Sequence, residues 1–145
     1  MGENDGHRDR LRQRYLTGGL DSLPDEQVLE LLLFYALPRK DTKPLAKKLL
    51  AHFGSLTATL EAGYEELVKV NGIGPRAAML ISMVTPLSRR YMLGKNVKGQ
   101  VMDTTQICGQ YLVPYFHGLT TEHVYMMCLD ARCKLIECKL LEQGT

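Results

Sequence analysis

Apolar residues in the first two thirds of the chain recur at the three- and four-residue spacing of amphipathic helices, with breaks at glycine or proline. The predicted helices are HRDRLRQRYL, a segment opened by Pro24 that contains VLELLLFYAL, then KPLAKKLLAHF, LTATLEA, YEELVKV and PRAAMLISMVTPLSRRYML. Pro86 is expected to kink or split the last of these, because proline inside a helix costs about 3 kcal/mol. We expect a compact all-α domain with the segment at 28–37, apolar almost all round, at its centre.

The composition changes at GKNVKGQVMDTTQ, which we interpret as a linker. A short helix, QICGQYLVPYF, is predicted after it. Two runs rich in β-forming residues, HVYMMCLD and KLIECKLLE, then flank the turn-like ARC and predict a β-hairpin. One helix and one hairpin are too little to bury a core, so this part is expected to be the opening of a larger α/β domain.

The sequence KVNGIGPRAAMLI, residues 69–81, places two glycines and a proline directly before an apolar helix pattern. Glycine permits positive φ values and close approach to the backbone, and proline suits the first helical turn. The amides of Ile73, Gly74 and Arg76 are then predicted to lie unpaired near a helix N-terminus, a favourable place for a phosphate group. Lys69 and Arg76 add positive charge.

This pattern resembles the helix-hairpin-helix motif of sequence-nonspecific DNA-binding proteins. It departs from the motif at Asn71, where many examples carry proline. The resemblance implies that the hairpin contacts the DNA backbone, and the candidate DNA-binding residues are Lys69, Asn71, Gly72, Ile73, Gly74 and Arg76. The alternative is a turn that serves only packing or protein contacts.

Residues 28–50 have the order of a degenerate first copy of the hairpin: a helix, a loop without glycine, and a second helix. Basic side chains take the place of the glycines and are long enough to reach phosphates. The candidates are Arg39, Lys40, Lys43 and Lys47, and Lys48 follows them. A solvated basic face explains any single one of these residues equally well. Since no base-reading element is present, we expect binding without sequence preference.

The composition, 45% hydrophobic and 23% charged, is that of a soluble globular protein. No apolar run approaches the roughly 20 residues of a membrane span, and the charged N-terminus lacks a secretory signal, so we expect a cytoplasmic protein without a membrane partner. Residues 1–99 carry fifteen Lys and Arg against eleven Asp and Glu, which permits a polyanion partner without requiring one. The four cysteines form no C-x-x-C pair and are expected to be reduced thiols.

The order of blocks along the chain resembles the bacterial RadC-like family, also called UPF0758 or DUF2466. The blocks are HRDRLRQRYL, LPDEQVLELLLFYALPRKDTKPLAKKLL, FGSL, VNGIGPRAAMLI and CLDARCKLIECKLLEQGT. The resemblance implies an N-terminal helix-hairpin-helix region, an MPN/JAMM metallopeptidase-like domain after it, and a link to DNA repair. In that second domain a His-x-His pair and a downstream Asp hold zinc, with a Glu as general acid and base.

This chain departs from the family at the zinc site. Its histidines are His7, His52, His117 and His123, so it has no His-x-His pair, and the resemblance places the zinc ligands beyond Thr145. Without a metal-bound water no hydrolysis of this kind is expected. We therefore assign no catalytic residue, no metal ligand and no cofactor to this chain, although zinc is implied for the full-length family.

The sequence thus predicts a mainly α chain: a helix-hairpin-helix domain over residues 1–95, a linker over 96–104, and an incomplete MPN/JAMM-like α/β domain over 105–145. Its predicted function is weak, sequence-nonspecific binding to the DNA backbone. One alternative is a protein-interaction module that uses the same hairpins. A second is a zinc metallopeptidase, if the full-length product continues past Thr145. The unpaired edge of the predicted β-hairpin also suggests a protein partner or self-association.

Overall fold

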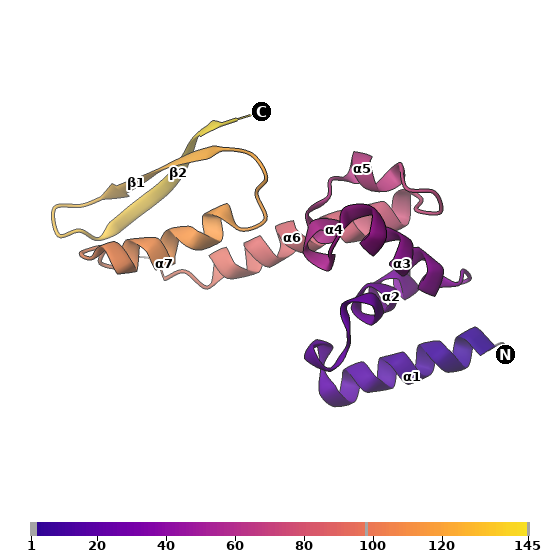
Figure 1. Ribbon diagram of the computed structural model, residues 1–145. Coiled ribbons are helices and arrows are strands. Elements are labelled where there is room, and N and C mark those ends of the chain that lie inside the picture. The colour runs from indigo at the N-terminus through magenta and orange to yellow at the C-terminus, as the bar shows by residue number, and fades with distance from the viewer. Residues whose placement is uncertain (1–2, 98, 145) are drawn as a thin grey trace. The chain divides into compact units, whose positions relative to one another are not determined.

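The computed structural model describes residues 3–97 and 99–144. As predicted, helices are followed by an antiparallel β-hairpin (Figure 1). The elements are α1 (Glu3–Gly18), the 3-10 helix η1 (Leu20–Ser22), α2 (Asp25–Ala36), α3 (Thr42–Phe53), α4 (Leu56–Glu61), α5 (Tyr64–Val68), α6 (Pro75–Gly94), α7 (Thr105–Phe116), β1 (His123–Leu129) and β2 (Leu135–Gln143). The chain divides into two compact units, Met1–Val84 and Thr85–Thr145.

The residues that begin and end the helices act through ordinary capping chemistry. Pro24 stands at the N-cap of α2, and the Ser55 hydroxyl accepts an amide hydrogen bond at the start of α4. Gly54 ends α3 in the left-handed conformation, with a φ of 94°. The Asp41 carboxylate caps α3, which the sequence pattern had not indicated. These local signals explain why the helix boundaries were predictable.

Helix α2 lies at the centre of the first unit, as predicted. Leu29 and Leu33 are fully buried in one cluster with residues of α3, α5, α6 and the turn before α6. Leu31 and Phe34 belong to a second cluster, which Leu11 of α1 completes. The helix is apolar on several sides because it packs in both clusters, while Tyr35 remains 69% exposed.

Pro86 does not split the last predicted helix, because α6 continues from Pro75 to Gly94 with Pro86 inside it. A kink at Pro86 stays a prediction. Each half of α6 has its own anchor. Ala78 and Ile81 are buried in the first unit, whereas the Arg89 side chain bonds to the Tyr125 hydroxyl at 2.7 Å in the second. These contacts offset the hydrogen bond that proline removes. Among the described helices, none is long and apolar enough to cross a membrane.

The second unit contains α7 and the hairpin of β1 and β2. Tyr115 and Phe116 of α7 pack against Tyr125 of β1, with ring centroids 5.1 and 5.3 Å apart. The Asp130 side chain accepts amide hydrogen bonds within the connecting turn, and Cys133 there has a φ of 63°. Register shifts between residues 124 and 125 and between residues 128 and 129 mark two β-bulges.

Part of the segment predicted as a linker packs on this hairpin. Val101 forms a bridge with Lys134, and the Met102 amide donates a 2.7 Å hydrogen bond to the Cys133 carbonyl. The Met102 side chain is 4% exposed. The division into domains at residues 95 and 104 stays a prediction.

Candidate nucleic-acid interface

The glycine turn before α6 has the geometry of a type II turn. The Ile73 amide donates to the Val70 carbonyl at 3.0 Å, and Gly72 at the third position has a φ of 96°. Such turns require a residue that tolerates positive φ at this position and accept proline at the second. Asn71 occupies the second position, so its departure from the motif pattern is compatible with the same turn.

A side chain of α3 also lies close to Gly72. A Cβ atom added there would lie 2.6 Å from Cδ2 of Leu45 on α3. This is too short for any real contact between carbon atoms. Gly72 therefore lets the turn lie directly against α3. Since this Leu45 methyl is the end of a flexible side chain, the positive φ of Gly72 is the stronger reason for glycine at this position.

Gly74 has a different role from Gly72. It has no positive φ, and a Cβ added there would meet no atom within 4 Å. Its carbonyl accepts the Ala78 amide at 3.0 Å, so Gly74 stands at the N-cap of α6. Among the described residues, nothing accepts a hydrogen bond from the amides of Gly74 or Arg76. Both amides belong to the positive end of a 20-residue helix.

The prediction of a free amide is wrong for Ile73, one of the three residues proposed. The Ile73 amide closes the turn by its bond to Val70, and the Ile73 side chain is 4% exposed in the core. A residue whose side chain is buried and whose amide is bonded has no group left for a phosphate. Of the amides proposed from sequence, Gly74 and Arg76 remain.

Lys48 of α3 places a cation at the turn. Its Nζ donates to the Asn71 carbonyl at 3.1 Å, although 23 residues separate the two in sequence. Lys48 lies one helical turn after Leu45, which contacts the same turn at Gly72. The candidate residues Lys69 and Arg76 are exposed on either side of the turn in sequence. In the sequence Lys48 was noted only as part of a basic run, because a contact between residues 23 positions apart produces no periodic pattern.

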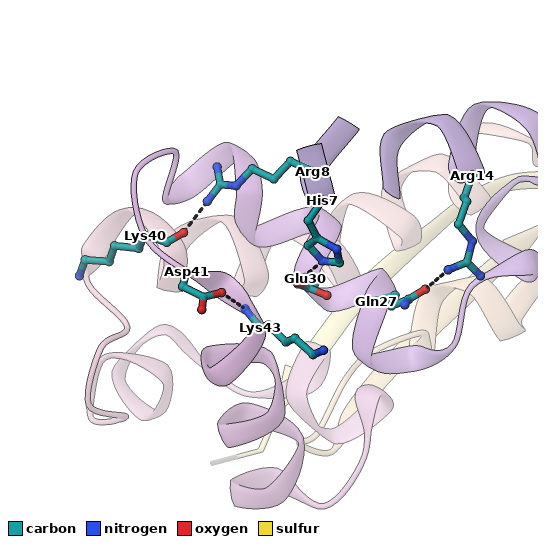
Figure 2. Close-up of polar contacts among 8 residues, drawn as sticks. All are labelled: His7, Arg8, Arg14, Gln27, Glu30, Lys40, Asp41 and Lys43. Atoms are coloured by element: carbon teal, nitrogen blue, oxygen red, sulfur yellow. Dashed lines mark hydrogen bonds and ion pairs between the residues drawn. The ribbon is translucent and has the colours of Figure 1, made fainter. Parts of the chain in front are cut away.

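The loop between α2 and α3 is held by a buried arginine of α1 (Figure 2). The Arg8 guanidinium donates to the carbonyls of Pro38 at 2.8 Å and Leu37 at 2.9 Å, and also to that of Lys40. Its Cζ lies 4.7 Å from the centre of the Phe34 ring, and the residue is only 6% exposed. These bonds satisfy carbonyls just past the end of α2 and fix the loop backbone.

The basic candidates on this loop and on α3 all remain available to solvent. Arg39, Lys40, Lys43 and Lys47 are exposed. Lys40 contributes its carbonyl to the Arg8 contact and keeps its ammonium group free of any described ion pair. Helix α3 joins the two basic regions, since Lys47 belongs to this exposed row and the adjacent Lys48 bonds to the glycine turn.

A hydrogen bond between His7 and the buried Glu30 fastens α1 to α2 beside Arg8 (Figure 2). The Glu30 carboxylate accepts a 2.9 Å hydrogen bond from Nε2 of His7, and Glu30 is 1% exposed. In the sequence Glu30 was only an interruption of an apolar run. The pair contributes to docking of α1, because a buried carboxylate without a partner is strongly unfavourable.

The zinc site implied for the full-length family does not fit the described residues. No three His, Cys, Asp or Glu side chains among them lie close enough together to hold a metal ion. His7 bonds to Glu30, and none of the four cysteines forms a disulfide. We therefore derive no metal-dependent chemistry for this chain.

These features define a small helical-bundle unit whose glycine turn leads into a longer helix. A family model described as UPF0758 N-terminal matches residues 5–79, from α1 to the first residues of α6. The match covers just over half of the chain, and the chain belongs to this family, which confirms the RadC-like resemblance over that stretch. No solved structure matches the chain. The MPN/JAMM-like continuation lies outside the matched residues and stays a prediction.

Proposed function

We propose that the unit Met1–Val84 binds the DNA backbone without reading base sequence. The observation that carries the proposal is the convergence of donors at the glycine turn. The amides of Gly74 and Arg76 have no partner among the described residues, and the Lys48 ammonium lies 3.1 Å from the Asn71 carbonyl of the same turn. Amides at a helix N-terminus together with a nearby cation form a favourable site for a phosphate group.

The loop between α2 and α3 would provide a second group of contacts. Arg8 holds this loop from inside, so the exposed Arg39 and Lys40 start from a fixed backbone. Lys43 and Lys47 continue the basic row along α3. Contacts of this kind position a protein on DNA but carry no base information. An association with DNA repair, which the RadC-like resemblance implies, is compatible with such binding and is part of the proposal.

Fluorescence anisotropy with labelled duplex and single-stranded DNA, at two salt concentrations, tests the proposal. Gly74→Ala is the informative variant, because its methyl group has open space in the fold but would stand where a phosphate approaches the backbone. Gly63→Ala is a matched control: Gly63 is also a helix N-cap, on α5, with a φ of −75° and no atom within 4 Å of an added Cβ.

The proposal expects wild-type binding that weakens steeply with salt, is reduced several-fold by Gly74→Ala, and is unchanged by Gly63→Ala. Circular dichroism would verify that both variants are folded. Equal binding by the two variants would remove the glycine turn from the interface. An absence of wild-type binding at low salt would overturn DNA binding altogether.

A protein-interaction role is the second candidate, and an apolar hollow in the first unit favours it. The hollow has a volume of about 330 Å³, and its lining includes Tyr15, Leu20, Leu32, Tyr35 and Leu60. The expected occupant is the apolar face of a partner helix, since such faces dock into grooves lined by aliphatic and aromatic side chains. Failure of the folded wild-type chain to bind DNA at low salt would favour this role.

A further inference from the structure

The outer edge of β2 is largely unpaired. In the described part of the chain, β1 and β2 make a two-stranded sheet. Backbone hydrogen bonds from another segment reach β2 only near its beginning, where the Leu135 amide donates to Gln100 and the Met102 amide donates to Cys133. The edge from Ile136 onward faces no other strand among the described residues. A free strand edge is a template for pairing with another strand.

The backbone direction along this edge follows from bonds at both ends of β2. The Leu135 amide points away from β1, because it donates to the Gln100 carbonyl at 3.0 Å. At the other end, the Gly144 amide donates to the Glu122 carbonyl. The neighbouring residues His123 and Gln143 are therefore a non-hydrogen-bonded pair, and the backbone groups of Gln143 point away from β1. Along β2, backbone groups that face β1 alternate with groups that face outward, with one extra residue at each bulge. Following this alternation from Leu135 and from Gln143 gives the same assignment for the residues between the bulges. The amides and carbonyls of Cys138 and Leu140 face outward.

The side chains of this edge are complementary to themselves. Glu137 and Lys139 alternate along β2 and lie 3.3 Å apart at their charged atoms. If two copies pair antiparallel with Cys138 opposite Cys138, Glu137 of each copy faces Lys139 of the other, which gives two opposite-charge pairs. The same register places Ile136, which is 66% exposed, opposite Leu140, which is 47% exposed. Opposite charges and apolar pairs across neighbouring strands are both stabilising.

Neighbouring registers lack this complementarity. Moving the second copy along β2 to the next outward-facing pair brings Lys139 opposite Lys139 in one direction and Glu137 opposite Glu137 in the other. Like charges directly opposite one another are destabilising. A two-fold axis at Cys138 therefore selects one register, and a self-complementary surface is what a two-fold dimer requires.

We propose that two copies of this chain associate through the outer edges of β2, antiparallel, with Glu137 opposite Lys139. Backbone pairing is centred on Cys138. It ends before Leu135, where Gln100 already occupies the edge, so the interface is short. The association is accordingly weak and depends on protein concentration. It does not depend on the proposed DNA binding, which belongs to the other unit.

Charge reversal tests the register. Sedimentation velocity over a range of concentrations would follow the whole chain and the variants Glu137→Lys, Lys139→Glu and the double exchange. Each single variant places like charges opposite each other in its own dimer and is expected to raise the dissociation constant roughly ten-fold. The double variant, and an equimolar mixture of the two single variants, restore both opposite-charge pairs and are expected to associate as the wild type does.

The mixture is the decisive sample. Within each single-variant chain, residues 137 and 139 still carry like charges after mixing, so weak association caused by a folding defect would persist. Weak association caused by like charges across the dimer would be relieved in the mixture. Glu122 is exposed and lies outside both strands; Glu122→Lys changes the net charge as Glu137→Lys does and is expected to leave association unchanged. A monomeric wild type at the highest concentration, or a mixture no better than its components, would overturn the proposal.

Discussion

Cδ2 of Leu45 lies 2.6 Å from the point that a Cβ atom at Gly72 would occupy. Leu45 of α3 therefore lies close to the glycine turn, and Lys48 on the same helix bonds to the carbonyl of the residue before that glycine. Gly72 and Gly74 therefore have different roles in the turn. Gly72 allows the turn to form against α3, and Gly74 leaves the backbone at the start of α6 open to solvent.

Gly72→Ala is expected to destabilise the chain, by about 1–3 kcal/mol, because alanine at positive φ is strained and its methyl group must displace Leu45. Gly74→Ala is expected to cost less than about 1 kcal/mol, since it meets neither problem. Urea denaturation followed by circular dichroism would compare the free energies of unfolding. Similar losses in the two variants would contradict the division of roles.

Arg8→Lys is expected to destabilise the chain by about 1–3 kcal/mol although it keeps the charge. A lysine cannot reproduce the planar fork that donates to the carbonyls of Leu37, Pro38 and Lys40 together. The matched control is Arg10→Lys, because Arg10 is exposed on the same helix. Urea midpoints of the two variants would be measured side by side. A midpoint for Arg8→Lys as high as that of Arg10→Lys would show that the loop does not depend on this fork.

The sequence was informative where a residue acts on its neighbours. Ser55, Gly54 and Pro24 begin or end helices by local chemistry, and two runs rich in β-forming residues around a turn located the hairpin. It was uninformative where a side chain acts across the fold. Arg8 bonds to carbonyls 29 to 32 residues away, and such a contact has no period in the sequence. The basic pattern of α1 therefore gave no sign that one arginine is buried.

The same limit applies to the candidate site. The two glycines and the proline were visible as a motif, but their separate roles depend on Leu45 and on the closing bond from Ile73 to Val70. A motif indicates that a tight turn exists. Which amides remain free depends on the turn type and on the packing around it, and both are properties of the folded chain.

The second unit is expected to lose stability in alkaline solution. Burial raises the pKa of the Cys138 thiol, and burial together with the hydrogen bond that the Tyr115 hydroxyl makes to Tyr111 raises the pKa of that hydroxyl. The folded chain therefore keeps these protons at a pH where the unfolded chain releases them. Stability is complete below the unfolded pKa values, about 8.5 for a thiol and about 10 for a tyrosine, and falls as the pH rises above them.

Near-UV circular dichroism of the tyrosines during urea denaturation, at pH 7.5 and pH values up to about 10.5, would measure this decline. Cys138→Ala and Tyr115→Phe remove the titrating groups, so the variants are expected to show a shallower fall than the wild type. A fall of equal steepness in both variants would assign the alkaline effect to other residues.

Cys138 is expected to react with thiol reagents more slowly than Cys133 at pH 7.5. The raised pKa of Cys138 lowers its thiolate fraction, and the thiolate is the reactive form. Cys133 lies exposed in the turn between the strands, whereas Cys138 is only partly accessible. Alkylation for short times, followed by peptide mass spectrometry, would give the two rates separately. Faster modification of Cys138 would contradict its partial burial in the second unit.

Lys48→Ala is expected to weaken DNA binding several-fold and to reduce the slope of log affinity against log salt by about one, as for the loss of one phosphate contact. The reason is position: of the described lysines, Lys48 has its ammonium group bonded to the turn, at the Asn71 carbonyl. Arg10→Ala removes the same charge from an exposed place on α1, outside both basic groups, and is the control. Anisotropy titrations at four or more salt concentrations would give the slopes. If the two variants lower the slope equally, binding reflects overall charge, and the glycine turn has no special share in it.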